Sequence, residues 1–420
     1  MNKLFFVLLA IVFASCQSKN QSNRNAETNY ELDSLTHKLQ TIHDKGFING
    51  FGVALVNQNG TVYSSGFGYS NIETSSAYTE NSVQNIGSVS KTFIGISLLK
   101  AQDLNLLQLD DPISKYLPFE VKNPHFPDVP ITIRQLATHT SSLLDTDVYD
   151  EKCYVLTDHV VVPDSVMDMS EIFNPPNTAI SLINFLEKLL KKDGEWYQEE
   201  GFIKHKPGEI FEYSNLGSSL AAAVLEIATN KSFNQFATEH ILKPLNMSSS
   251  GWSFDDIDLP DHSKLYIKPS IELPFYSLIT YPDGGLLTSS ADMAKYLTEL
   301  INGYNGEGTL LSKEGYQEYF REQLQADNFL EERDDDFEFD EEYNSGIFIG
   351  HTYTGLIGHT GGDPGVATFM FFNPASKTGK FMMINTAVRG SDEAVAEFYD
   401  AWYTLDKYEK MLSSEDRNKH

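Results

Sequence analysis

Basic residues are scarce in this 420-residue chain: 31 Lys and Arg stand against 59 Asp and Glu, for a net charge of −28. Nucleic-acid binding needs basic surface that neutralises phosphates, so this balance argues against a nucleic-acid partner. The field of the protein does not attract anions either, so local groups must hold any anion that binds. The apolar fraction of 41% is typical of a globular protein. The chain is long enough for one large domain or two subdomains.

Cysteine is nearly absent, with only Cys16 and Cys153 in the chain. Once Cys16 is acylated, as argued below, Cys153 is the only thiol and no internal disulfide forms. We expect Cys153 to be a bystander rather than a nucleophile. No His and Cys cluster has metal-ligand spacing, so neither a metal nor a cofactor is predicted. The acidic run 331–342 lacks the glycine of a calcium loop and is interpreted as a solvated loop.

Long apolar runs are lacking at the N-terminus too. The run from Leu4 to Val12, which follows Lys3, is too short to span a membrane as a stable helix. Small residues directly precede Cys16, as in a bacterial lipoprotein signal whose cysteine becomes the lipidated first residue. Phe13 departs from the usual aliphatic residue, and plain secretion is the alternative.

This start of the chain predicts the domain organisation. Residues 1–16 are expected to be a lipoprotein signal peptide, and residues 17–29 a flexible tether, because they are polar and lack periodicity. Residues 30–410 are then one folded domain. We expect a lipid on Cys16 to anchor it in a bacterial cell envelope, on the periplasmic side or at the cell surface. The sequence carries no signal for the oligomeric state.

Strand patterns lie at both ends of the folded domain. Phe51–Val56 and Thr61–Gly66, joined through Asn59-Gly60, predict a hairpin. Four later segments alternate or run apolar between turns and predict an antiparallel set: Gly346–Gly350, Leu356–Thr360, Val366–Phe372 and Lys380–Thr386.

Helical spacing appears before, between and after these strands. The predicted helices are one with Leu32, Leu35, Leu39 and Ile42 ending near Gly46, one over Leu216–Thr229 ending at Asn230, and one opened by Ser391 with Val395, Phe398, Trp402 and Leu405. We therefore predict an α/β (α+β) fold. Both termini build one antiparallel sheet, N- and C-terminal helices flank it, and a helical subdomain of about residues 110–280 is inserted.

The most informative segment places Ser88 and Lys91 three residues apart, where a strand-like stretch gives way to an apolar helix. Such a step returns the side chain to nearly the same helix face, so the Lys91 amine comes within reach of the Ser88 hydroxyl. A desolvated lysine can take the serine proton and so activate a nucleophile. A second pair, Ser97 and Lys100, lies half a turn around the helix and is expected to face away. An ordinary helix-cap serine is the alternative interpretation of Ser88.

A second segment contains Tyr213-Ser214-Asn215. A phenol beside a lysine ammonium loses its proton more easily and can serve as base or acid. Asn215 can bridge Lys91 and a substrate carbonyl through its amide. The same three letters recur at Tyr69-Ser70-Asn71, but these close a short strand and are interpreted as a turn.

The third segment is Gly358-His359-Thr360-Gly361-Gly362. Such glycines let a substrate backbone lie close to a strand edge. The amides of Gly362 and Ser88 can form an oxyanion hole, in which one donor typically contributes roughly 3–4 kcal/mol of transition-state stabilisation. The similar Lys377-Thr378-Gly379 lies between two predicted strands and is interpreted as a turn.

In this order, the three segments resemble those of the serine β-lactamase and D,D-peptidase (penicillin-binding protein-like) family. The likeness is to its class C-like branch, which includes esterases and peptidases, and it covers roughly residues 35–405. Further stretches agree with it: Leu109–Pro112, Ile131–Leu143, Lys243–Met247 and Gly284–Leu286. The chain has no Gly-x-Ser-x-Gly elbow, which argues against an α/β-hydrolase.

The resemblance implies a serine hydrolase with an α/β sandwich beside a helical subdomain. It implies Ser88 as the nucleophile of an acyl-enzyme, Lys91 and Tyr213 as the proton-transfer pair, and Asn215 as a substrate-positioning residue. The expected partner is a small-molecule or peptide substrate with an amide or ester bond, and no cofactor is implied.

The third segment departs from the family pattern. His359, Thr360 and Gly361 stand where β-lactamases of this branch usually carry Lys-Thr-Gly, whose cation helps to hold the substrate carboxylate. His359 would help to polarise the site and bind substrate, but histidine is mostly neutral at pH 7 unless a carboxylate raises its pKa. With the negative net charge, this favours peptidase or esterase action over efficient β-lactam hydrolysis.

Further departures concern the surroundings of the site. Ser142 stands where the family more often has glycine, and Asp283 where a small residue precedes the paired glycines. The stretch 143–206 is long for the family and is expected at the cleft rim. His139 is interpreted as a structural histidine. The alternative function is a non-catalytic envelope lipoprotein that binds peptide or cell-wall ligands with the same fold.

Overall fold

The computed structural model describes residues 30–160, 173–330, 339 and 344–417. The predicted signal peptide, Cys16 and tether, and nearly all of the acidic run 331–342, therefore lie outside the described residues. Among the residues that are described, no helix has both the length and the apolar character that a membrane span requires.

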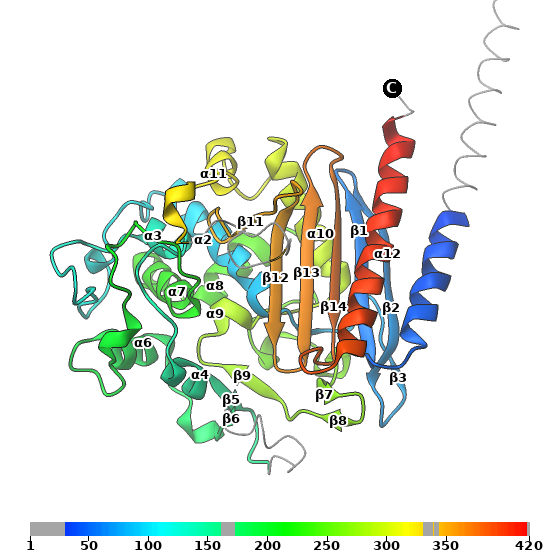
Figure 1. Cartoon of the computed structure of the whole chain (residues 1–420), viewed down its shortest axis with the longest axis horizontal. Helices are drawn as coiled ribbons and strands as arrows, with labels where there is room; N and C mark the ends of the chain where they lie inside the picture. The colour runs from blue at the N-terminus through cyan, green and yellow to red at the C-terminus, as the bar shows by residue number, and fades with distance from the viewer. Residues whose placement is uncertain (1–29, 161–172, 331–338, 340–343, 418–420) are drawn as a thin grey trace, which may run out of the picture.

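One antiparallel sheet is the frame of the described chain (Figure 1). Its strands lie in the order β11-β12-β13-β14-β1-β2-β3. Their bounds are β1 Gly50–Asn57, β2 Gly60–Asn71, β3 Ser76–Ala77, β11 Gly350–His351, β12 Ile357–Asp363, β13 Val366–Asn373 and β14 Thr378–Ile384. Strand β1 pairs with β14 from Phe51 opposite Ile384 to Asn57 opposite Thr378. The prediction of a mixed α/β fold with an antiparallel sheet built from both ends of the chain is confirmed.

Two details of the predicted strands differ. The β1–β2 hairpin turns through Gln58-Asn59, because Asn57 already pairs with Gly60. Residues 346–349 do not form the predicted strand. Phe348 has a φ of +51°, which breaks an extended conformation, and its amide donates to the carbonyl of Ala137 instead.

Two helices from opposite ends of the chain cover one face of the sheet, side by side in Figure 1. They are the N-terminal helix of residues 30–43 and α12 (Asp392–Arg417). Leu35 and Leu39 of the first pack with Phe398 and Trp402 of the second in one apolar cluster. Val395, predicted in the apolar stripe of α12, is instead 36% exposed.

The opposite face of the sheet packs on α10 (Ser290–Tyr304) and continues into the main core. The remaining helices lie beyond that face, to the left in Figure 1. They are α2 Lys91–Asp103, α3 Ile133–Ala137, α4 Asp147–Cys153, α6 Leu182–Leu190, α7 Asn215–Thr229, α8 Phe233–Ala237, α9 Tyr281–Gly284 and α11 Lys313–Tyr319. Helix α7 ends at Asn230 in the left-handed conformation, as predicted.

Short strand pairs connect these parts. Strand β4 (Gln84–Asn85) pairs with β10 (Leu287–Thr288), just before the chain reaches Ser88. Strands β5 (Tyr154–Leu156), β6 (Phe173–Asn174) and β9 (Tyr276–Leu278) form a small sheet, and β7 (Tyr266–Lys268) pairs with β8 (Ile271–Glu272).

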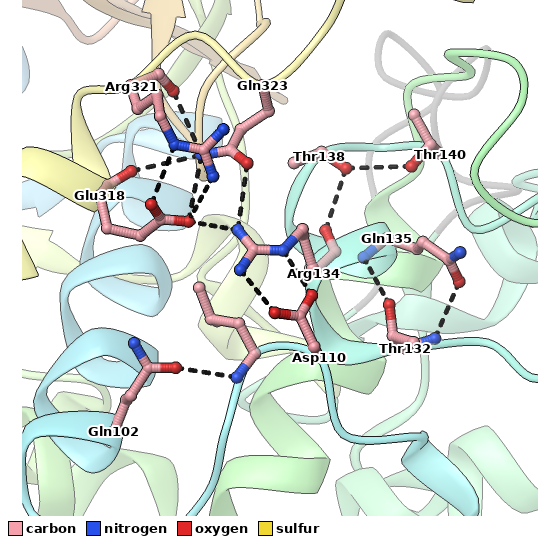
Figure 2. A network of polar contacts seen from close by, with 11 residues as sticks. Gln102, Asp110, Thr132, Arg134, Gln135, Thr138, Thr140, Glu318, Arg321 and Gln323 are labelled. Carbon is pink, nitrogen blue, oxygen red and sulfur yellow. Dashed lines mark hydrogen bonds and ion pairs between the residues drawn. The ribbon is translucent and has the colours of Figure 1, made fainter.

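Arg134 of α3 links the helical region to α11 (Figure 2). Its guanidinium donates to both carboxylate oxygens of Asp110, at 2.6 and 2.9 Å, and also to Glu318 and Gln323. Thr132 caps the start of α3 in a reciprocal capping box with Gln135. This network fixes the segment that leads to His139.

Candidate active site

Ser88 and Lys91 meet where the short 3-10 helix η1 (Gly87–Ser90) runs into α2. The Lys91 side chain is 0% exposed, and its Nζ donates to Ser88 Oγ at 2.9 Å and to the carbonyl oxygen of Asp283 at 2.8 Å. Ser88 itself is only partly buried, so its hydroxyl lies between the buried amine and the surface. This is the arrangement that an activated serine requires.

The neighbouring pair Ser97 and Lys100 has no such arrangement. Ser97 is 0% exposed, and no described residue hydrogen-bonds its hydroxyl. Lys100 Nζ instead donates to the carbonyl of Leu310 at 2.8 Å. The helix phase thus separates the two pairs as predicted.

Tyr213 lies over the same amine. Lys91 Nζ is 5.4 Å from the centroid of the Tyr213 ring. The centroids of the Tyr213 and His359 rings are 6.5 Å apart. The three segments that the sequence singled out therefore meet at one place, although more than 270 residues separate Ser88 from His359. Lys91 contacts the Ser88 hydroxyl directly, and Tyr213 joins the site through the contact of its ring with the Lys91 amine.

His139 supports Tyr213 from behind. The two rings stack with centroids 4.4 Å apart, and His139 Nδ1 accepts a hydrogen bond from the Ser214 amide at 3.1 Å. Burial, with the charge of Lys91, holds the pKa of His139 well below its usual range. A buried, uncharged ring that accepts a hydrogen bond at Nδ1 holds Tyr213 in place by packing. This agrees with the interpretation of His139 as a structural histidine.

The backbone amides of Ser88 and Gly362, the predicted oxyanion donors, lie where strand β12 closely approaches the start of α2. A Cβ added to Gly361 would lie 2.1 Å from the Ile86 carbonyl oxygen and 3.0 Å from the Ser88 amide nitrogen. A Cβ added to Gly87, whose φ is +53°, would lie 2.6 Å from the Gly362 amide nitrogen. Only glycines permit strand β12 to approach the start of α2 so closely.

The family follows from these segments together with sequence comparison. The family model described as Beta-lactamase matches residues 35–402. The chain belongs to the beta-lactamase family.

The relatives of this beta-lactamase family member are distant. Protein flp of Staphylococcus aureus (strain MW2) is 25% identical over 282 residues, which are 66% of this chain and 49% of flp. The chain thus spans about half the length of these curated relatives. The putative penicillin-binding protein PbpX of Bacillus subtilis (strain 168) is 24% identical over 74% of this chain and 69% of its own.

A solved structure shares the fold. The octameric penicillin-binding protein homologue from Pyrococcus abyssi superposes with a TM-score of 0.63 at 22% identity, over 89% of this chain and 76% of that one. The mixed α/β architecture of the beta-lactamase and penicillin-binding protein folds is therefore present here.

The family's third segment carries no cation in this chain. His359 is 1% exposed, and burial lowers its pKa to about 3. Its Nδ1 lies 2.5 Å from the carbonyl oxygen of Thr360, the next residue of β12. The imidazole is therefore neutral at pH 7, as the sequence suggested.

Asn215 has a different partner from the one expected. Its amide nitrogen donates to Asp145 at 2.8 Å, and the backbone amides of Asn215 and Leu216 donate to the same carboxylate. The first amides of α7 lack helical acceptors, and an anion stabilises a helix start. Asp145 thus holds Asn215, whose role toward substrate stays a prediction. No local pattern marks Asp145, since it caps a helix from 70 residues away.

Two carboxyl groups under the site were not identified as partners. Asp283 Oδ2 accepts hydrogen bonds from Tyr149, at 2.5 Å, and from Ser219, at 2.7 Å. Burial raises the pKa of Asp283 to about 6, and the charge of Lys91 opposes this rise. Because the main chain of Asp283 also accepts from Lys91, this residue supports the amine directly.

Asp363 follows Gly362 at the end of β12 and accepts hydrogen bonds from Tyr154, at 2.7 Å, and from Asn85, at 3.0 Å. Burial raises its pKa to about 7. Tyr154 and Tyr149 both belong to the stretch 143–206, which was expected at the cleft rim. At least this part of the stretch reaches beneath the site, and Tyr149 is only 3% exposed.

Other predicted features have simple structural roles. Ser142 has a φ of +68°, which explains why glycine is usual there, and its hydroxyl accepts from Asn123 at 2.9 Å. Burial raises the pKa of the Cys153 thiol well above its usual range, which disfavours the thiolate. Among the described residues, no group of three or more His, Cys, Asp or Glu is arranged to hold a metal.

Proposed function

We propose that this chain is a serine hydrolase that cleaves an amide or ester through an acyl-enzyme on Ser88. The observation that carries the proposal is the fully buried Lys91 amine, 2.9 Å from a partly exposed serine hydroxyl. A buried lysine costs several kcal/mol unless it is compensated, and no packing need explains an amine beside a serine. The same contact is what a proton acceptor for the serine requires.

The residues divide the reaction between them. Ser88 Oγ attacks the substrate carbonyl carbon as its proton passes to the Lys91 and Tyr213 pair. The carbonyl oxygen then carries negative charge, which the amides of Ser88 and Gly362 stabilise. Return of that proton lets the alcohol or amine leave, and the acyl group stays on Ser88. Water activated by the same pair then releases the acid and restores the serine.

The charges around the site support an ester or a peptide rather than a β-lactam. β-Lactams carry a carboxylate, but His359 is neutral at pH 7. The cation of the site is Lys91, whose amine hydrogen-bonds Ser88, and the carboxyl groups of Asp283 and Asp363 bring negative charge to the same region. A substrate carboxylate would find no further cation among the site residues described, whereas an uncharged acyl or alkyl group meets no electrostatic penalty.

A substrate panel tests this proposal on one purified sample. We expect turnover of short acyl esters or of D-alanyl peptides whose C-terminal carboxylate is amidated, weak or no hydrolysis of the β-lactam nitrocefin, and loss of all turnover in Ser88→Ala. Nitrocefin as the best substrate would overturn the substrate class. Activity that survives Ser88→Ala would overturn the mechanism, and a panel without any turnover would favour the non-catalytic binding protein.

We also propose that the protein is a lipoprotein of a bacterial cell envelope, anchored through Cys16. The support is the sequence of residues 1–16, in which an apolar run and small residues precede the cysteine. In a bacterial expression host, the full-length chain should fractionate with membranes and carry a diacylglycerol mass on Cys16. Cys16→Ser should move it to the soluble fraction, and an unchanged distribution would contradict the anchor.

A further inference from the structure

The two predicted oxyanion donors belong to segments that touch without a hydrogen bond between them. Ser88 lies in η1, and Gly362 lies near the end of β12. The two segments are in close contact at Gly87 and Gly361. Yet within the described chain no residue of η1 forms a hydrogen bond with β12. Another contact must fix the spacing of the two amides, because both donors of an oxyanion hole have to lie within about 2.7–3.1 Å of one oxygen atom.

The Asn85 side chain reaches from one segment to the other. Asn85 ends β4, three residues before Ser88, and is only 4% exposed. Its Nδ2 donates to Asp363 Oδ2 at 3.0 Å, and Asp363 directly follows Gly362. One side-chain hydrogen bond therefore joins the segment before one oxyanion donor to the residue after the other.

The same amide group reaches the next residue of that turn through Tyr276. An amide NH2 group carries two hydrogens, so it can donate to two acceptors. Asn85 Nδ2 also donates to the Tyr276 hydroxyl at 3.3 Å, and this hydroxyl donates to the carbonyl oxygen of Pro364 at 2.8 Å. The hydrogen bonds and the chain at 363–364 thus close a ring, which restrains the spacing more firmly than a single hydrogen bond does.

Short strands anchor the members of this ring. Asn85 pairs with Leu287, where β4 meets β10. Tyr154 of β5 donates to the other carboxyl oxygen of Asp363, Oδ1, at 2.7 Å. Tyr276 lies on β9, which is the neighbour of β5 in the small three-stranded sheet. The ring is therefore attached to two pairs of strands rather than to loops alone.

We infer that Asn85 is a positioning residue: its amide ties the turn after Gly362 to the segment before Ser88 and so sets the spacing of the two oxyanion donors. The inference rests on the proposed hydrolase function, because it concerns the transition states of that reaction. Asn85 acts through the two backbone amides and not on a reacting atom, since both of its amide hydrogens are used within the protein.

Steady-state kinetics of Asn85→Leu with a short acyl ester test the inference. Leucine has nearly the shape of asparagine but has no amide group. We expect kcat to fall by about tenfold to a hundredfold, which is less than the roughly 10²–10³-fold cost of losing one oxyanion donor outright. KM should change by less than about threefold, because the oxyanion forms only in the transition states of acylation and deacylation.

Asn49→Leu is the matched control. Asn49 Nδ2 also joins distant segments, because it donates to the carbonyl oxygen of Pro269 at 2.8 Å, but neither residue hydrogen-bonds a residue of the site. Both leucine variants should lose a similar amount of stability in thermal unfolding. Only Asn85→Leu should lose kcat, whereas a merely structural role of the Asn85 amide would give the two variants the same activity.

Tyr276→Phe guards against a folding defect at Asn85. The variant keeps the aromatic packing of the ring against Tyr154 and Phe173 and removes only the hydroxyl. We expect kcat to fall by about threefold to tenfold, the effect of one lost hydrogen bond. The double variant of Asn85→Leu and Tyr276→Phe should be about as active as Asn85→Leu alone, because both changes open the same ring.

The outcomes separate this inference from the hydrolase proposal. If the wild type hydrolyses the ester and Asn85→Leu keeps kcat within about twofold of it, the inference is wrong and the hydrolase proposal stands. Equal losses of kcat in Asn85→Leu and Asn49→Leu, or additive losses in the double variant, would also overturn it. If Asn85→Leu does not fold, an unchanged kcat in Tyr276→Phe decides against the inference. A wild type without turnover would overturn the hydrolase proposal and this inference with it.

Discussion

The Lys91 amine donates hydrogen bonds to two neutral oxygen atoms, the Ser88 hydroxyl and the main-chain carbonyl of Asp283. Tyr213 covers the amine with its ring and rests in turn on His139. Proton transfer at this site should therefore depend on Tyr213 and on the charge of Asp283 in separable ways.

Removal of the Tyr213 hydroxyl tests the proton-transfer pair. Tyr213→Phe keeps the ring stacked on His139, so the fold should be retained, while kcat for an ester falls by about 10²–10⁴-fold. Tyr69→Phe is the matched control, since Tyr69 begins the other Tyr-Ser-Asn and is 45% exposed. Equal activities of the two variants would show that Tyr213 does not transfer protons.

Neutralisation of Asp283 tests its electrostatic role. The pKa of this carboxyl is about 6, so it is mostly ionised at pH 7 and favours the protonated amine of Lys91 by Coulomb attraction. Asp283→Asn keeps an acceptor for Tyr149 and Ser219 but removes the charge. In a plot of kcat/KM against pH, the midpoint of the acidic limb should therefore move to lower pH by about half to one unit. A purely structural role would lower activity without moving the limb.

The sequence pattern brought the candidate residues Ser88 and Lys91 together and did not mark the groups that reach the site from distant segments. Ser88 and Lys91 share one helical turn, and the glycines of β12 have a spacing that a strand edge explains. Asp145 reaches α7 from another loop, and Tyr149 reaches Asp283 across 134 residues. No periodicity encodes such contacts, because they depend on how the elements pack.

Among the helices and strands, the Arg134 network is the best-defined tie between separate elements (Figure 2). Arg134 lies on α3, Asp110 precedes that helix, and Glu318 lies on α11. Backbone hydrogen bonds already join the Asp110 segment to the start of α3, and the contact of Arg134 with Glu318 adds α11 to this pair. Burial of Arg134 is partial, with 25% of its side chain exposed, so the contribution to stability is moderate.

Loss of this tie should lower stability but not catalysis. We expect Arg134→Met to reduce the free energy of unfolding by about 1–2 kcal/mol, because the carboxylates lose their shared donor. Denaturant titration measures the change, and kcat/KM should stay the same. Arg321→Met is the control, since Arg321 is 52% exposed and its ion pair, among the described residues, is with Glu318 three residues before it. If Arg321→Met reduced the free energy of unfolding as much as Arg134→Met, the proposed role of Arg134 in linking α3 to α11 would be contradicted.

Element boundaries show where sequence patterns suffice and where packing intervenes. Strands β12, β13 and β14 start within two residues of their predicted positions, because alternation and turn residues mark them. The apolar run at 346–349 also looks like a strand but turns through Phe348 to reach the Ala137 carbonyl. Val395 has helical spacing but lies beyond the edge of the sheet-facing stripe, and is exposed.

Across the entire chain, the sheet unites segments more than 300 residues apart, and the site lies between it and the helical region. Buried carboxyl groups at this junction link stability to pH. The pKa of Asp363 is raised from 3.8 to about 7, so the folded state holds a proton that the unfolded chain releases. The stabilisation from this group is fully present below about pH 4 and is lost as the pH rises through 7.

Asp363→Asn removes this pH dependence. Between pH 5 and pH 8, the free energy of unfolding of the wild type should fall by about 2 kcal/mol relative to that of this variant, which is a conservative value for a pKa shift of this size. Thermal unfolding at both pH values measures the difference. Asp128→Asn, at an exposed aspartate, should run parallel to wild type. Parallel behaviour of Asp363→Asn as well would show that Asp363 is ionised in the folded protein throughout this range.

The most direct test of the account is covalent labelling of Ser88. The protein is incubated with a fluorophosphonate, which phosphonylates activated serines, and its intact mass is recorded. We predict one adduct on the wild type and none on Ser88→Ala. The control is Ser97→Ala, which removes the buried serine of the other Ser-x-x-Lys pair and should still form one adduct. No adduct on the wild type, or an adduct that survives Ser88→Ala, would contradict the central claim that Ser88 is an activated nucleophile.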